Sequence, residues 1–214
     1  MAAAATLAQP ATSNQVKDLL ELAPVIYLEG VTRENFLKLI ERFPEHQLER
    51  EPNGLVTIMP PTHGGSSIRE NLIGRRVGNW CESHNNGMTF SSSGGFDLPS
   101  GATKSPDVAW MSDATLGLLS PKDIEEGFVP AAPDFVAEIR SGSDSLEKLK
   151  TKIKDSWIAN GVRLAWLIDP YEETAWVYRA DGTVDKVEGF DKQLSGEDVM
   201  PDFTLDLSEF KVRK

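Results

Sequence analysis

The sequence has 214 residues, of which 40% are hydrophobic, which is enough for one domain with a sizeable core. Its 33 acidic and 22 basic residues give a formal charge of −11, which opposes nonspecific binding to polyanions. A lone cysteine, Cys81, excludes an internal disulfide and a thiolate metal site, and no run approaches the roughly 18 apolar residues of a membrane span. We therefore expect a cytoplasmic protein without membrane contact.

The N-terminal part of the chain predicts a leader followed by a helix. Residues 1–24 are rich in Ala, Thr, Ser and Gln, so burial cannot offset their ordering entropy, and we expect a flexible leader before a single domain over 25–214. Within that domain, apolar residues recur at helical spacing between Thr32, a suitable N-cap, and Pro44, which stops a helix.

A hairpin and a second helix come next. Residues 46–60 alternate apolar and polar on both sides of Asn53-Gly54, a pair that favours a tight turn between two antiparallel strands. Residues 62–84 then carry one apolar stripe at i, i+4 and i+5 steps, which predicts an amphipathic helix.

The rest of the chain predicts a sheet with one more helix. Residues 144–161 carry a helical stripe, with Asp144 and Glu147 as a capping box and Gly161 as the stop. Short β-rich runs lie on both sides of that helix, at residues 87–93, 94–99, 105–111, 133–141, 162–170, 174–182, 183–190 and 202–210. This order predicts an α/β or α+β fold, with a mixed sheet flanked by helices.

Acids stand inside two of these apolar strands. Asp107 opens "PDVAW", and Glu138 lies in the middle of "PDFVAEIR". Because side chains alternate along a strand, Glu138 shares a face with Asp134 and Arg140. Burial would raise the pKa of Glu138 unless a cation or a hydrogen-bond donor compensates, so a buried acid here demands a partner.

Three kinds of partner are open for Glu138. Asp107 lies 31 positions earlier, so the two carboxylates could converge from adjacent strands on a divalent cation that activates water. A salt bridge to Arg140, or hydrogen bonds with a loop, would serve equally. In the purely structural alternative Asp107 caps a strand, Asp134 is exposed and Glu138 pairs with Arg140.

The two acids and their neighbours resemble a known family. Pro106-Asp107 with Glu138-Ile139-Arg140 is similar to the motif of the PD-(D/E)xK nuclease superfamily. The likeness to the Uma-type family of restriction endonucleases within it spans about residues 27–210, and it is carried by "IMPPTHGGSS", "FSSSGGFDLPSGATKSPDVAWM", "GFVPAAPDFVAEIRSGSD" and "WIANGVRLAWLIDP".

The resemblance implies a restriction-endonuclease-like core that cleaves DNA with Mg²⁺, for which Mn²⁺ could substitute. Asp107 and Glu138 would then be metal ligands and catalytic residues, and the carbonyl of Ile139 would complete the coordination. Arg140 stands where such nucleases carry lysine. Arginine stays protonated and cannot act as a general base, but it could stabilise developing negative charge.

Other cations and acids could join such a site. Some superfamily members recruit a lysine from the following helix, which here offers Lys150, Lys152 and Lys154, and we favour Lys152. Glu49 fits the additional N-terminal acid of many such sites. His63 could contact a phosphate or cap the helix after it.

The function inferred from the sequence is a Mg²⁺-dependent endonuclease that acts on DNA, as a homodimer with one site for each strand. The alternative is a catalytically idle protein of the same fold, with a binding or structural role. Trp166 and Trp176 could stack on bases, but core packing accounts for them better because no Lys/Arg cluster surrounds them.

Overall fold

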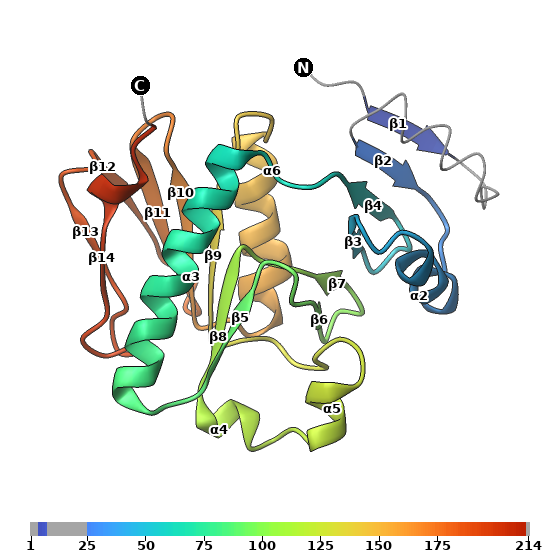
Figure 1. The fold of residues 1–214 in the computed structure, drawn as a ribbon, viewed down its shortest axis with the longest axis horizontal. Coiled ribbons are helices and arrows are strands. Elements are labelled where there is room, and N and C mark those ends of the chain that lie inside the picture. The colour runs from blue at the N-terminus through green and yellow to red at the C-terminus, as the bar shows by residue number, and fades with distance from the viewer. Residues whose placement is uncertain (1–3, 8–24, 213–214) are drawn as a thin grey trace. The chain divides into compact units, whose positions relative to one another are not determined.

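In the computed structural model of this chain, residues 4–7 and 25–212 are described, and they divide into two compact units (Figure 1). Unit 1 contains the described residues up to Thr62 together with Ser100–Lys104, and unit 2 contains His63–Pro99 and the residues from Ser105 onward. The single domain expected over 25–214 stays a prediction. The leader expected over 1–24 lies outside the described residues except at Ala4–Leu7, where the structure has a strand.

Unit 1 is a sheet with one helix. Its strands follow the order β1-β2-β4-β3-β7. The expected hairpin is present as the antiparallel pair β3/β4, and the hydroxyl of Thr32 accepts the Asn35 N–H at 3.2 Å to cap the helix as predicted. The elements are β1 (Ala4–Leu7), β2 (Val25–Leu28), α2 (Arg33–Arg42), β3 (Gln47–Arg50), β4 (Val56–Met59) and β7 (Thr103–Lys104).

Unit 2 is built on a six-stranded sheet in the order β12-β11-β10-β9-β8-β5. Strands β9 and β10 are parallel and the other neighbours are antiparallel, so the sheet is mixed and the predicted fold class is confirmed. The strands are β5 (Met88–Ser91), β8 (Val108–Met111), β9 (Phe135–Ile139), β10 (Leu164–Asp169), β11 (Thr174–Arg179) and β12 (Val184–Glu188).

Smaller elements complete unit 2. Phe96 of β6 forms a parallel bridge with Val129, and β13 pairs antiparallel with β14. The connection after β8 contains two short helices. These elements are β6 (Phe96–Asp97), α4 (Asp113–Leu116), α5 (Pro121–Glu125), β13 (Gln193–Ser195), β14 (Thr204–Asp206) and a 3₁₀ turn, η3 (Leu207–Phe210).

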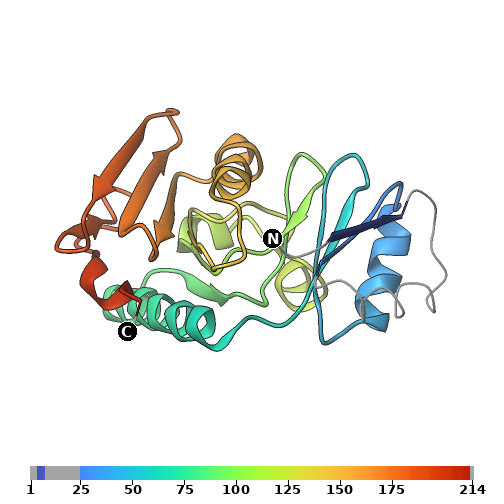
Figure 2. The same ribbon diagram turned by 90° about the horizontal axis from the view of Figure 1, so that it is seen from above.

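Helices cover both faces of this sheet (Figure 2). On one face, α3 (Gly64–His84) packs its apolar stripe onto a core that includes Phe135, Ala137 and Ile139 of β9. On the other face, the helix after β9 approaches Glu138, whose carboxylate contacts Trp157. The alternation expected along β9 therefore holds, although both of its faces are covered and all five residues are buried.

The helix after β9 departs from the prediction at its start and in its middle. Asp144 does not form the expected capping box; its carboxylate accepts the Ser141 N–H at 2.8 Å, and Ser145 caps the helix instead. The regular part, α6 (Leu146–Thr151), continues as a π-helix, η1 (Lys152–Trp157), and then as a 3₁₀ turn, η2 (Ile158–Asn160). Gly161 ends it in the left-handed region, as predicted.

Two further expectations concern burial. Asp134, exposed in the purely structural alternative, is buried, and its carboxylate accepts hydrogen bonds from the Ser112 N–H at 2.8 Å and the Thr115 hydroxyl at 2.7 Å. Asp134 lies just before β9, next to the end of β8, so the chain after β8 supplies these donors. Trp166 and Trp176 are buried, so core packing is confirmed for both.

Gly87, between α3 and β5, offers a test of the sheet edge. Its φ is +84°, and a Cβ there would lie 2.0 Å from the Met111 carbonyl oxygen, whereas Gly182 has the same φ and open space around it. We expect Gly182→Ala to lower the free energy of unfolding by about 1–2 kcal/mol and Gly87→Ala by about 3 kcal/mol or more. Urea unfolding measures both, and equal losses would contradict the close approach of β5 to β8.

Candidate carboxylate site

Asp107 and Glu138 come together in unit 2 because β8 and β9 are adjacent. The strands pair antiparallel with Val108 opposite Ala137, so the residues just outside this pair, Asp107 and Glu138, are also neighbours. The Asp107 carboxylate accepts the backbone N–H of Ile139 at 2.6 Å. The convergence expected from the sequence spacing is thus present, and it is fixed by a strand ladder rather than by a loop.

Glu138 is a buried carboxylate with two side-chain donors. It is 3% exposed, and its Oε1 lies 2.8 Å from the Lys152 Nζ and accepts the Trp157 indole N–H at 2.8 Å. Lys152 Nζ also donates to the Ser105 carbonyl oxygen at 3.0 Å. A cation and a neutral donor on one oxygen offset the cost of burying the charge.

The π-helix places both donors on the same side. Lys152 and Trp157 are five residues apart, which on an α-helix would separate their directions by about 140°. A π-helix closes each turn through an i to i+5 hydrogen bond, so residues five apart lie one above the other. The irregular segment Lys152–Trp157 is therefore what lets both side chains reach Glu138.

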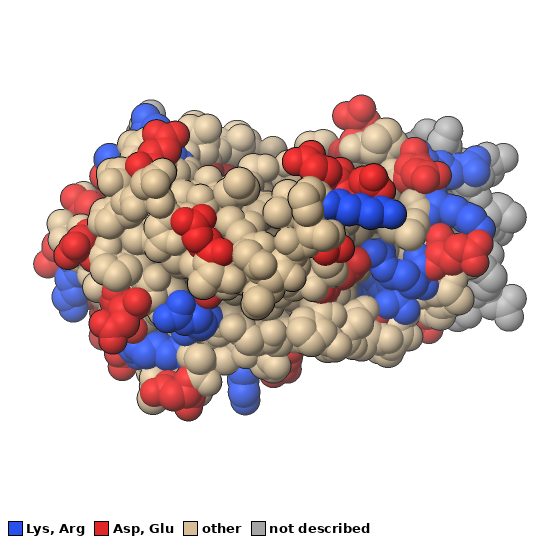
Figure 3. All heavy atoms as spheres, turned by 90° about the horizontal axis from the view of Figure 1, so that it is seen from below, with Lys and Arg blue, Asp and Glu red and all other residues tan. Residues whose placement is uncertain are grey.

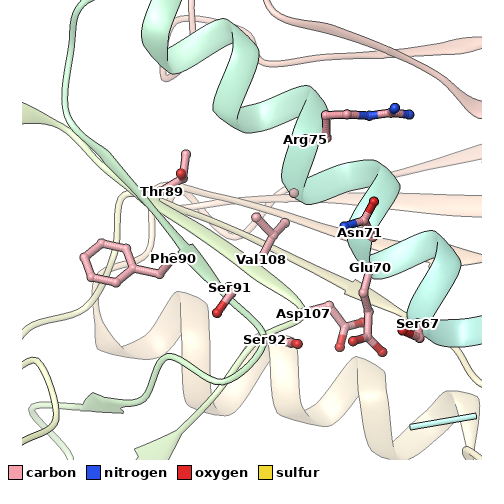
Figure 4. Close-up of a pocket in the computed structure, with 11 residues that line it drawn as sticks. Ser67, Glu70, Asn71, Arg75, Thr89, Phe90, Ser91, Ser92, Asp107 and Val108 are labelled. Atoms are coloured by element: carbon pink, nitrogen blue, oxygen red, sulfur yellow. The ribbon is translucent and has the colours of Figure 1, made fainter.

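Glu70, on α3, is a third acid at the site that the sequence analysis missed. Its carboxylate lies beside that of Asp107 (Figure 4), and both residues line one cleft. A signal was present in the sequence: Glu70 precedes Ile73 and Val77 by three and seven residues, so it is an acid in line with the buried stripe of an amphipathic helix.

The surroundings of Asp107 favour its protonated form. Burial raises the pKa of Asp107 well above its usual value, and the negative charges of Glu138 and Glu70 raise it further. The Ile139 N–H and the Lys152 ammonium act in the opposite direction and are outweighed. Clustered acids of this kind are relieved by a bound cation.

Arg140 leaves the site, although it shares a strand with Glu138. Its guanidinium lies 2.8 Å from the fully buried carboxylate of Asp169 and donates from Nε to the Asp144 carbonyl oxygen at 3.3 Å. The salt bridge between Glu138 and Arg140 considered from the sequence is therefore wrong: Glu138 pairs with Lys152. Arg140, two positions after Glu138, contacts Asp169, whereas Glu138 contacts Lys152.

The remaining candidates have other partners or are exposed. Glu49 belongs to unit 1, where its carboxylate lies 3.2 Å from the Lys104 Nζ and both side chains are buried. His63 is the exposed N-cap residue of α3, and its side chain makes no capping hydrogen bond, so it does not cap the helix through its ring. Lys150 pairs with Glu147 at 2.9 Å, and Lys154 is exposed.

A cleft of about 580 Å³ opens beside Asp107, between α3 and the strands β5 and β8 (Figure 4). Glu70 and Asp107 lie together, while Arg75 extends away from them along α3. Hydroxyl and amide groups provide most of the other polar lining, which comprises Ser67, Asn71, Thr89, Ser91 and Ser92. The cleft therefore combines hard anionic oxygens with neutral hydrogen-bonding groups.

The donor set of this cleft fits a hard divalent cation. Asp107 and Glu70 present carboxylates to it, and Glu138 adjoins Asp107 across the strand pair. Carboxylate oxygens are the ligands that Mg²⁺ and Mn²⁺ accept. Within residues 4–7 and 25–212, no three His, Cys, Asp or Glu side chains are grouped so that they could hold a metal ion as they stand. Coordination by the Ile139 carbonyl stays a prediction.

Comparisons with known proteins agree on the kind of molecule. Residues 33–208 match the Uma2 family, described as "Putative restriction endonuclease". The crystal structure of a protein from Anabaena variabilis, titled a putative nuclease belonging to DUF820, superposes with a TM-score of 0.67 at 21% identity and covers 84% of this chain and 97% of that one. No curated protein matches the sequence. Among the described residues, no helix is long and apolar enough to cross a membrane.

The raised pKa of Asp107 predicts how its replacement changes stability with pH. A carboxyl whose folded pKa exceeds its ordinary value of 3.8 costs stability as pH rises through that interval, since the folded state binds the proton more tightly. Asp107→Asn removes this cost and can still accept the Ile139 N–H. We expect the free energy of unfolding of the variant, relative to that of the wild type, to be larger at pH 7 than at pH 4.

Urea unfolding of both proteins at the two pH values, in EDTA, measures this difference. An Asp107→Asn stability difference that is the same at both pH values would show that the pKa of Asp107 is not raised in the folded state.

Proposed function

This chain belongs to the Uma2 family, and from that premise we propose that it is a metal-dependent endonuclease that hydrolyses phosphodiester bonds of DNA. The observation that carries the proposal is the cluster of Asp107 and Glu138 on adjacent strands, with Lys152 on one of its carboxylates. The carboxylates would hold Mg²⁺ or Mn²⁺, with Glu70 as a further anionic neighbour. The restriction-endonuclease-like family to which the match points supports this choice of cofactor.

A cation bound there would lower the pKa of a coordinated water and offset the charge of the phosphate. In the reaction the water oxygen loses a proton to solvent and forms a bond to phosphorus, the bond from phosphorus to one sugar oxygen breaks, and the leaving oxygen takes up a proton from solvent. Asp107 and Glu138 hold their geometry through the Ile139 N–H and the Trp157 indole. The hydroxyl-lined cleft gives the substrate strand hydrogen-bond partners.

Lys152, rather than Arg140, is the cation that suits the chemistry. Its Nζ lies 2.8 Å from a Glu138 oxygen and donates to the Ser105 carbonyl at 3.0 Å, and both acceptors stabilise an ammonium there. In that form it stabilises negative charge that develops on the phosphate. Arg140 is committed to Asp169, so we assign it to support of the adjoining structure. Glu49 stays a prediction as an additional acid.

The charge of the chain restricts how DNA could be bound. The net charge is −11, and on the face shown in Figure 3 Lys and Arg lie among Asp and Glu rather than in one broad basic field. A polyanion would therefore be held through the metal and a few local contacts. The homodimer and the cytoplasmic location expected from the sequence stay predictions.

One observation favours a second candidate, an idle protein of the nuclease fold. Glu138 already has Lys152 and Trp157 as partners, so the cluster could serve as a buried ion network alone. In that case Glu138→Gln would leave the Lys152 ammonium without its anion and destabilise the fold strongly, by about 3 kcal/mol or more. A metal site, in contrast, tolerates loss of one of its crowded acids in the apo-protein.

Calorimetric titration with Mn²⁺ and Mg²⁺, beside a plasmid-nicking assay, tests the leading proposal. We expect the wild type to bind metal and nick, and Asp107→Asn and Glu138→Gln to lose both, because each removes a charged ligand. The Asp113→Asn variant, which alters an acid at the start of α4, is the charge-matched control and should behave as the wild type. Wild-type protein that binds neither ion would rule the proposal out in favour of the idle scaffold.

Replacement of Lys152 separates charge stabilisation from metal binding. Lys152→Met should lower the nicking rate by about 100-fold while metal binding persists, since the ammonium acts on developing charge. Lys154→Met, at an exposed position in the same π-helix, loses the same charge and should leave the rate unchanged. Equal effects of the two substitutions on the rate would contradict a specific role for Lys152.

A further inference from the structure

A second hollow adjoins the carboxylate cleft along α3. Ser67, Asn71 and Arg75 are exposed at steps of four residues, so they lie on one side of the helix. All three line the cleft that holds Asp107, and all three also line a hollow of about 850 Å³. Ligand-binding pockets measure about 300–1,000 Å³. The row on α3 therefore joins the carboxylates to a space large enough for a further part of a substrate.

Tyr171 is a braced aromatic ring in the lining of this second hollow. Tyr171 is 45% exposed, and the guanidinium carbons of Arg69 and Arg140 lie 5.9 Å and 5.8 Å from the centroid of its ring. Its backbone N–H donates to Asp169 Oδ1 at 3.0 Å, and a Cβ on Gly142 would stand 3.2 Å from its hydroxyl oxygen. A ring held on several sides and still open to solvent is suited to stacking.

Arg140 explains why the ring is held there. The same guanidinium pairs with Asp169 Oδ2 and lies over Tyr171, while Asp169 Oδ1 accepts the Tyr171 N–H. The residue that takes the place of the motif lysine thus contacts the ring of Tyr171, which lines the second hollow. The cation at this position therefore contacts the aromatic ring and Asp169, and not Glu138.

Arg75 is the cation of this hollow that remains available to an anion. Arg69 is buried and donates to the carbonyl oxygens of Phe210 and Gly65, and Lys211 lies 3.2 Å from a Glu173 oxygen. Arg75 is exposed and, within the part of the chain that the structure describes, forms no ion pair. Arg75 shares its side of α3 with Asn71 and Ser67, and its side chain extends away from Asp107 (Figure 4).

We propose that the second hollow binds an unpaired nucleotide of the substrate strand, with its base on Tyr171 and a phosphate on Arg75. This inference rests on the proposed function, because it places the nucleotide next to the phosphate at the carboxylates. Aromatic rings combined with single cations are how proteins bind single strands without reading sequence. A base inside a duplex has both faces covered by its neighbours, so the hollow selects a strand that is unpaired beside the cleavage point.

Fluorescence anisotropy with an end-labelled mixed-sequence single strand and with the blunt duplex of the same sequence, in Ca²⁺, tests the subsite. Tyr171→Leu should weaken binding of the single strand by about tenfold or more and leave duplex binding unchanged. Tyr171→Phe, which keeps the ring, should bind the single strand as the wild type does. Equal single-strand affinities for Tyr171→Leu and the wild type, or equal weakening with both DNAs, would overturn the proposal.

Arg75→Gln tests the hollow at an exposed position, independently of any folding effect at Tyr171. It should reduce the slope of log affinity against log salt for the single strand by about 0.7, the value for one lost phosphate contact. Arg42→Gln, an exposed arginine at the end of α2 in unit 1, is the control and should leave that slope unchanged. An unchanged slope for Arg75→Gln would also overturn the proposal.

Calorimetry with Mn²⁺ on the same variants separates the two levels of inference. Mn²⁺ binding by the wild type and by Tyr171→Leu, together with unchanged single-strand affinity, would overturn the subsite and leave the proposed function standing. A wild type that neither binds Mn²⁺ nor nicks plasmid would overturn the proposed function itself.

Discussion

The structure of unit 2 depends on the burial of one carboxylate. Glu138 lies in the middle of a covered strand with only 3% of its surface exposed, where an unpaired charge would cost several kcal/mol. The contacts that offset this cost, from Lys152 and Trp157, come from a single π-helical turn. On an α-helix the two side chains would point about 140° apart, so the irregular turn brings both of them toward the buried acid. These contacts join the helix to the sheet and hold a lysine beside the acids.

Helix α3 packs on the opposite face of the sheet, and its two sides meet different environments. Its buried stripe packs against β9, whereas Ser67, Asn71 and Arg75 face the cleft and the hollow. Glu70 stands where these sides meet and adds its charge to that of Asp107. One rigid element therefore sets the core, an acid of the site and the path along which a strand could run.

The sequence predicted what local pattern controls and missed what tertiary packing controls. The strand pairing of Asp107 with Glu138 followed from two apolar runs at suitable spacing, and the fold class followed from the order of helices and strands. The fate of Arg140 could not be predicted, because Asp169, its partner, is 29 residues away on a neighbouring strand. Helix propensity does not predict the π-helical turn, whose side chains contact a buried acid on a strand. Glu70 was not predicted because an acid near an apolar stripe ordinarily faces solvent.

The placement of Arg140 and Lys152 bears on how such a site can change its residues. A cation is needed near the carboxylates, but the side chain that carries it can come from the strand or from a helix that packs on the same face. Because Lys152 pairs with Glu138 from the helix, the residue at position 140 does not need to supply a cation to Glu138. Arginine is then the better occupant, since its planar guanidinium binds a buried carboxylate and stacks on an aromatic ring at the same time. Both properties are used here, toward Asp169 and Tyr171. In the proposed nuclease, the cation beside the carboxylates would therefore come from the helix and not from the strand.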